Sequence, residues 1–244
     1  MKKIVFYSIL TFSLVLILHT FCNAQDHPVL IDSIYSGILK EERPVKVLLP
    51  DTYKPGSPAI IVAVPNRYIN AANQRDRDFL PVHVPQPAIS GGAGNFLSFF
   101  KNELIPYIDK TYPTNGTNSL YGHSYGGLFV LYALLSEPQL FASYYATDPP
   151  FRFNDDYLIK MAAKKLENLP PDKILWLAGN DLSYKSQGID RLDSVLRDKA
   201  PASLHWKMVT YPNETHNSVR LKAMYDGIKY SYSGYQMHQS VSNR

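Results

Sequence analysis

The segment GHSYG at 122–126 is the part of the chain best equipped for chemistry, because it fits the pattern G-x-S-x-G. A short strand is expected before it at 119–121, and a nearly all-apolar helix is expected after it at 126–136. This strand–turn–helix setting is typical of a nucleophile elbow, which raises a serine hydroxyl above the carboxyl edge of a sheet. Ser124 is therefore the predicted nucleophile, and the backbone N–H of Tyr125 is predicted to face the oxyanion. The alternative is a glycine-rich turn with an incidental serine.

A serine hydroxyl is a weak nucleophile and needs a general base. His216 lies in the segment YPNETHNSV, after the last expected strand and before the last expected helix. The chain order of α/β-hydrolases is serine, then acid, then histidine, and Ser124 and His216 satisfy it. His216 is therefore the predicted base. His123, inside the elbow, is expected to point into the flank of the fold and to be structural.

The acid that orients the histidine is less narrowly defined by the sequence. Asp181 is the favoured residue, because it lies in the loop after the expected strand at 173–178, and it would stabilise the imidazolium of His216. Asp190 and Asp193 on the following helix and Asp148 after the strand at 142–146 are the rivals. A serine–histidine dyad without an acid also stays open.

The elements that must position these residues alternate between strand and helix from Ala59 onward. The run AIIVAV at 59–64 is continuous, apolar and β-branched, which is typical of a buried strand. The pattern predicts an α/β fold, a mostly parallel sheet with helices on both faces, in a single domain over 25–244. Residues 66–94 are expected to form a long loop. The expected strands are 29–35, 45–49, 59–64, 119–121, 142–146, 173–178 and 204–211, and the expected helices are 95–110, 126–136, 155–168, 189–199 and 219–230.

Residues 1–24 have the pattern of a secretory signal peptide: Lys2 and Lys3, an uncharged apolar run at 4–18, and small residues before Gln25. The run is shorter than the ~20 apolar residues of a membrane span. A lipoprotein anchor at Cys22 is the other alternative, disfavoured by the residues that precede it. We therefore expect export to the periplasm or outside the cell, with no stable membrane insertion after cleavage. Because Cys22 is the only cysteine, the mature chain would have no disulfide and no cysteine nucleophile.

Composition narrows the class of protein further. The chain has 244 residues, of which 45% are hydrophobic and 19% are charged, which excludes a disordered chain, a collagen and a coiled coil. The net charge of +4 is small and the basic residues are interspersed, so nucleic-acid binding is not expected. No metal or cofactor is required by serine-based hydrolysis. The sequence leaves the oligomeric state open.

Several stretches resemble the putative esterase family of α/β-hydrolases, which is related to esterase D and includes enterochelin esterases. They are SIYSGILKEERPVKVLLPDTY, IVAVPN, RDFLP, GGAGNFLSFFKNELIPYIDKTYPT, LYGHSYGGLFVLYALLSEPQLFASYYATDPP and YPNETHNSVRLKAMYDGIKY, which cover most of 32–230. The resemblance implies an α/β-hydrolase fold and carboxylic ester hydrolysis. It also implies Ser124 as the nucleophile and His216 as the base.

The chain departs from that family at one point, since about one strand–helix unit is missing before Ala59. In many hydrolases the loop in this region supplies the second oxyanion N–H. Asn66 or Arg67 is expected to donate in its place. The expected function is that of a secreted serine esterase that cleaves a small-molecule ester through an acyl-enzyme on Ser124. Its activity is expected to be impaired if no residue replaces the missing donor. The alternatives are a hydrolase relic that binds a siderophore, sugar ester or peptide without catalysis, and an acyltransferase.

Overall fold

The computed structural model of the protein describes residues 29–49, 61–63, 68–69, 72–87, 89–112 and 114–232. The predicted signal segment 1–24 and the predicted oxyanion residue Asn66 lie outside the described residues. Within the described ranges, no helix is both long and apolar enough to cross a membrane.

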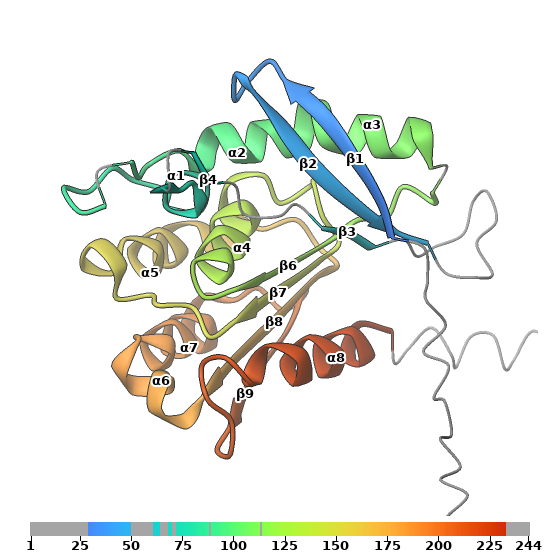
Figure 1. The fold of residues 1–244 in the computed structure, drawn as a ribbon. Coiled ribbons are helices and arrows are strands. Elements are labelled where there is room, and N and C mark those ends of the chain that lie inside the picture. The colour runs from blue at the N-terminus through green and yellow to red at the C-terminus, as the bar shows by residue number, and fades with distance from the viewer. Residues whose placement is uncertain are drawn as a thin grey trace, which may run out of the picture.

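Four parallel strands form the sheet that carries the candidate site, in the order β6-β7-β8-β9 (Figure 1). Parallel strands place all their carboxyl ends at one edge of the sheet, where the residues that follow them gather. The segments after the four strands therefore meet at this edge, although they are far apart in the sequence. The strands are β6 Ser119–His123, β7 Ser143–Thr147, β8 Lys173–Asn180 and β9 Leu204–Tyr211.

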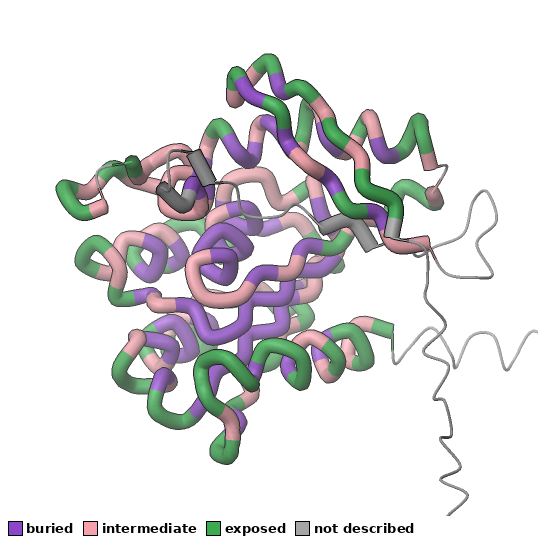
Figure 2. Tube along the Cα trace, in the orientation of Figure 1, coloured by how far each residue is buried: buried purple, intermediate pink, exposed green. Residues whose placement is uncertain are grey.

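Helices cover both faces of this sheet, as the alternating pattern predicts. Successive residues of β7 separate the two faces: Tyr144 belongs to the large apolar core with the helices α4, α5 and α7, whereas Tyr145 packs in a smaller cluster with α8. All of β7, most of β8 and most of the helix between β6 and β7 are buried (Figure 2). The helices are α4 Tyr125–Ser136, α5 Phe153–Lys165 with the short 3-10 helix η2 Leu166–Asn168, α6 Asp181–Ser186, α7 Ile189–Lys199 and α8 Val219–Tyr232.

A separate antiparallel sheet, β1-β2-β3, precedes the parallel one. Its strands are β1 Val29–Ser36, β2 Glu41–Leu48 and β3 Ile61–Ala63, so the strand expected at 59–64 is described only in its middle. Among the described residues, no strand joins β3 to β6, and only twelve residues, 49–60, separate β2 from β3. This arrangement agrees with the expectation that one strand–helix unit is missing before Ala59.

The helix expected at 95–110 is present as one continuous helical segment that includes a π-helical turn. It comprises α2 Ala93–Phe99, η1 Phe100–Leu104 and α3 Ile105–Thr111. Its phenylalanines pack on α4, with the rings of Phe96 and Phe129 5.1 Å apart between centroids. The segment 66–94, expected to be a loop, also contains a short hairpin, β4 Tyr68–Ile69 and β5 Ala72–Asn73, and the helix α1 Arg75–Phe79.

A buried group of charges attaches α1 to β2. Arg43 is 1% exposed, and its guanidinium lies 2.9 Å from a carboxylate oxygen of Asp78 and 3.1 Å from Glu41. Arg77 extends the group, since it contacts Glu41 at 2.6 Å and Asp78 at 2.7 Å. The hydrogen bond that Arg77 donates to Glu41 is the main cause of a raised pKa of Arg77. Removing one partner of such a buried pair leaves an uncompensated charge, so the network holds α1 firmly beside the site.

Candidate active site

The backbone at Ser124 has the strained conformation of a nucleophile elbow, with φ 60° and ψ −124°. The turn is fixed on both sides: the Ser124 N–H donates to the Thr147 carbonyl at 2.9 Å, and the Ser124 carbonyl accepts from the Gly127 N–H at 2.8 Å. A residue other than glycine keeps a positive φ in this region only where the surrounding structure holds its backbone in place. Tyr125 occupies the first position of α4, where a backbone N–H has no acceptor within the helix. Its N–H is thus free of the helical ladder next to the hydroxyl of Ser124.

The glycines of the elbow have unequal roles, and this gives a matched pair of substitutions. A Cβ at Gly122 would lie 2.1 Å from the Gly126 carbonyl oxygen, whereas a Cβ at Gly126 would meet nothing within 4 Å. We expect Gly122→Ala to displace the elbow and to lower both the melting temperature and the yield of folded protein, with a destabilisation of about 1–3 kcal/mol. Gly126→Ala should unfold like the wild type. Equal melting temperatures for the two variants would contradict this description of the turn.

Asp148 is the carboxylate that contacts the predicted base. Its Oδ2 lies 2.6 Å from Nδ1 of His216, and the Asp148 side chain is fully buried while 48% of the His216 side chain is exposed. Oδ2 also accepts from the Asn180 side-chain amide at 2.9 Å and from the Ser183 hydroxyl at 3.1 Å. Asp148 directly follows β7, and its own φ of 49° turns the side chain to the carboxyl edge of the sheet. The hydrogen bonds hold the carboxylate in one orientation toward His216.

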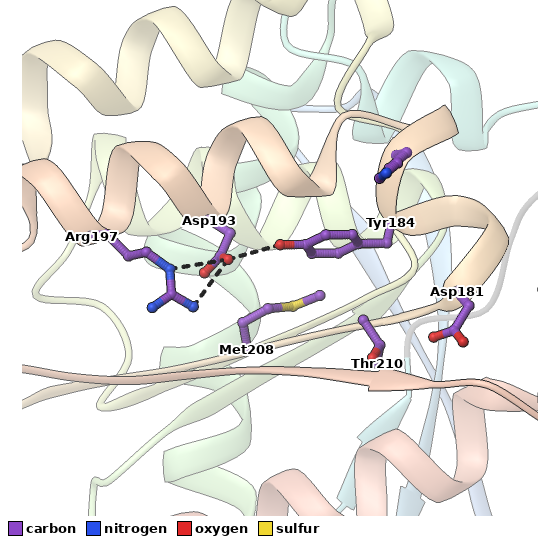
Figure 3. Close-up of a pocket in the computed structure, with 7 residues that line it drawn as sticks. Asp181, Tyr184, Asp193, Arg197, Met208 and Thr210 are labelled. Carbon is purple, nitrogen blue, oxygen red and sulfur yellow. Dashed lines mark hydrogen bonds and ion pairs between the residues drawn. The ribbon is translucent and has the colours of Figure 1, made fainter.

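The assignment of Asp181 as the orienting acid is therefore wrong in its geometry. β8 continues two residues beyond its predicted end, so Asp181 becomes the first residue of α6 and its side chain is exposed. Asp181 lines a separate polar pocket of about 350 Å³ between α6, α7 and β9 (Figure 3). In the same pocket Asp193 accepts hydrogen bonds from Tyr184 at 2.9 Å and from Arg197 at 3.2 Å. Asp190 accepts from a backbone N–H of α7, so neither rival on that helix contacts His216.

His123 also differs from its expected position in the flank of the fold. Its Nε2 lies 2.6 Å from the backbone carbonyl oxygen of His216, and the two imidazole rings are 4.5 Å apart between centroids. Burial is the main cause of a lowered pKa of His123. Because His123 immediately precedes Ser124, this contact places the His216 loop against the elbow. Between the described side chains, no hydrogen bond joins Ser124 Oγ to His216.

The elbow has a cationic neighbour on its outer side. The guanidinium of Arg75, from α1, lies 5.1 Å from the ring centroid of Tyr125. The centroids of the Tyr125 and Phe153 rings are 6.3 Å apart. A guanidinium over an aromatic ring is attracted by the negative face of the ring. One cationic side chain therefore lies beside the first residue of α4.

Three residues of the candidate site have side chains of the kinds that bind metal ions. His123, Asp148 and His216 each offer one potential ligand atom, and these atoms lie within 4.8 Å of one another. Imidazole and carboxylate are ligands that divalent zinc accepts. Hydrolysis by a serine nucleophile does not require such an ion.

Known proteins of the esterase class match this chain in sequence and in fold. The profile of the family described as "Putative esterase" matches residues 56–176, a range that contains Ser124 and Asp148. A solved structure titled an IroE-like serine hydrolase, from Shewanella oneidensis, is 28% identical, with a TM-score of 0.70 over 83% of this chain and 79% of that chain. The fold is therefore that of an α/β-hydrolase, as the resemblance implied. Over the matched residues the chain is thus similar to the putative esterase family.

Two curated relatives are named as esterases of siderophores. The siderophore triacetylfusarinine C esterase of Aspergillus fumigatus is 39% identical over 85 residues, which are 34% of this chain and 29% of the relative. The ferri-bacillibactin esterase BesA of Bacillus subtilis is 35% identical over 94 residues, which are 36% of this chain and 32% of the relative. The matched part of the chain thus spans about a third of the length of these relatives.

Proposed function

We propose that the protein is a serine esterase that cleaves carboxylic esters through an acyl-enzyme on Ser124. The single observation that carries the proposal is the contact of His123 Nε2 with the His216 carbonyl oxygen at 2.6 Å, because it brings the loop of the His216–Asp148 pair to the turn that holds the strained Ser124. Serine, base and orienting carboxylate are the three groups that acyl transfer to a hydroxyl requires. Asp148 is their third member here, in place of Asp181.

The proposed chemistry follows from the hydrogen-bond partners of the side chains in the site. The carboxylate of Asp148 holds the Nδ1–H of His216, so Nε2 is the nitrogen left to accept a proton from Ser124 Oγ. Oγ attacks the ester carbonyl carbon, and the resulting oxyanion accepts a hydrogen bond from the Tyr125 N–H. The imidazolium returns the proton to the leaving alcohol. Water, activated by the same histidine, then releases the acid and regenerates the serine.

We further propose that the natural ester belongs to the siderophore class and that the protein acts after export. The names of the curated relatives support the first part, and the guanidinium of Arg75 over the Tyr125 ring suits an anionic group on the substrate. The signal-like segment 1–24 supports the second part. The second oxyanion donor is proposed to be Asn66 or Arg67.

A panel of esters tests the proposal and its substrate class together. The purified protein should hydrolyse p-nitrophenyl acetate and butyrate at modest rates. It should cleave a trilactone or hydroxamate siderophore with a kcat/KM at least about tenfold higher, because binding energy from remote substrate groups raises the rate of the chemical step. Cleavage is measured by chromatography of the released monomers. Hydrolysis of the simple esters alone would remove the siderophore assignment, and no hydrolysis of any ester by folded protein would favour a non-catalytic relic.

A further inference from the structure

Strand β6 reaches the segment that carries His216 through two side chains. Tyr121 and His123 are two residues apart and so lie on the same face of the strand, where both are half-buried. The Tyr121 hydroxyl donates to the Arg220 carbonyl at 2.9 Å, and His123 Nε2 contacts the His216 carbonyl oxygen at 2.6 Å. The strand that leads into Ser124, the predicted nucleophile, thus also holds the backbone of His216, the predicted base.

The His123 contact has a defined proton arrangement. A carbonyl oxygen only accepts hydrogen bonds, so Nε2 of His123 carries the proton and donates it. Burial lowers the pKa of His123 and so favours the neutral form of its ring. A neutral ring 4.5 Å from the His216 ring adds no positive charge that would oppose formation of the imidazolium.

The rest of the His216 loop is held mainly by its own residues. Thr215 and Ser218 exchange three hydrogen bonds of 2.9 to 3.2 Å, and the Val219 N–H donates to the Thr215 carbonyl at 3.0 Å. Glu214 accepts from the Ser218 hydroxyl at 2.5 Å. These contacts fix the local shape of the loop, but they do not connect it to the elbow. Among the described residues, the contact of His123 with the His216 backbone is the hydrogen bond that joins the elbow motif to this loop.

We propose that His123 is a positioning residue for the reaction: its Nε2–H holds the backbone of His216 so that the imidazole stays in register with Ser124 and Asp148. This inference rests on the proposed function. A side chain that only fills space would be replaceable by any residue of similar volume. A positioning residue must retain a donor at one point in space.

Two amides of different length separate these possibilities. In His123→Gln the side-chain amide nitrogen takes the place of Nε2, whereas in His123→Asn it takes the place of Nδ1 and falls short of the His216 carbonyl. We expect His123→Asn to lower kcat for p-nitrophenyl acetate by about 10- to 100-fold, as displacements of about 1 Å do, with KM within about twofold. His123→Gln should restore kcat to within about threefold of the wild type.

Amide hydrogen exchange of residues 213–218 supplies a readout that does not depend on activity. Exchange should accelerate in His123→Asn and stay as in the wild type in His123→Gln. Tyr121→Phe is the matched control, since it removes the neighbouring hydrogen bond of the same strand; its kcat should change by less than about twofold, because Arg220 lies beyond the base.

The outcomes distinguish the two proposals. Equal kcat and equal exchange in the Gln and Asn variants would overturn the positioning role, and so would a Tyr121→Phe variant as impaired as His123→Asn. If the wild type hydrolyses no ester, the proposed function fails, while the exchange comparison still decides whether His123 holds the loop. If His123→Asn does not fold, a His123→Gln variant with wild-type kcat and exchange supports the role, and one with a lowered kcat overturns it.

Discussion

Ser124→Ala is expected to abolish ester hydrolysis, with kcat for p-nitrophenyl acetate falling by about 10⁴-fold or more. The variant keeps the turn and the His216–Asp148 pair but removes the atom that forms the acyl-enzyme. Its melting temperature should not fall, because alanine carries less side chain into the strained conformation of φ 60°. The measurement is a steady-state assay on protein purified in parallel with the wild type.

A matched serine on the surface controls for preparation and contaminating esterases. Ser194 on α7 is exposed, and its hydroxyl donates only to the Asp190 carbonyl within its own helix. Ser194→Ala should keep wild-type kcat and KM. Hydrolysis by Ser124→Ala at a rate comparable to that of Ser194→Ala would show that the activity does not pass through Ser124.

Asp148→Asn has the second large expected effect. The carboxylate accepts from His216, Asn180 and Ser183, whereas an asparagine amide at this position offers one oxygen and a donor group. If the amide group faces Nδ1, the imidazole is held in the wrong tautomer, a change that costs about 10⁴-fold in kcat in a serine protease triad. We expect a loss of about 10³- to 10⁴-fold in kcat, with KM changed little.

Asp181→Asn is the matched control for the identity of the acid. Asp181 is exposed at the start of α6 and lines the pocket of Figure 3, so this variant should retain kcat within about twofold. A large loss in Asp181→Asn, with Asp148→Asn active, would restore the assignment made from the sequence. Wild-type kcat in both variants would favour a dyad without an acid.

The sequence located the candidate nucleophile and the candidate base because both signals are local. GHSYG lies between a strand and an apolar helix, and the structure places a strained serine at that point. His216 follows the last strand and precedes the last helix, as predicted. The overall α/β architecture was equally predictable, since helical and strand periodicities alternate along the chain.

The acid was not predictable from local signals, because its identity depends on strand ends that meet only in the folded sheet. The choice between Asp148 and Asp181 was decided by the length of β8: two further residues of strand carry Asn180 to the edge and direct Asp181 outward on α6. Asn180 then binds Asp148 across the two neighbouring strands. One usable signal was the segment Asp148-Pro149-Pro150 directly after a fully buried strand, since the prolines end the strand at that residue.

The contact of His123 with the His216 loop was missed for a related reason. Side chains alternate across a strand, so position 123 faces the side of the sheet covered by α8. Which segment it meets there depends on where β9 ends and α8 begins. Only the folded chain brings the His216 carbonyl to it.

Covalent labelling tests the central claim, an activated serine at position 124, most directly. A fluorophosphonate needs an activated hydroxyl but little fit to the natural substrate, so it separates catalytic competence from substrate identity. Mass spectrometry of the labelled peptide should locate the phosphonyl group on Ser124. Labelling should be slowed by at least about 10³-fold in His216→Ala. Well-folded wild-type protein that stays unlabelled between about pH 6 and pH 9, or that is labelled equally well in His216→Ala, would contradict the account.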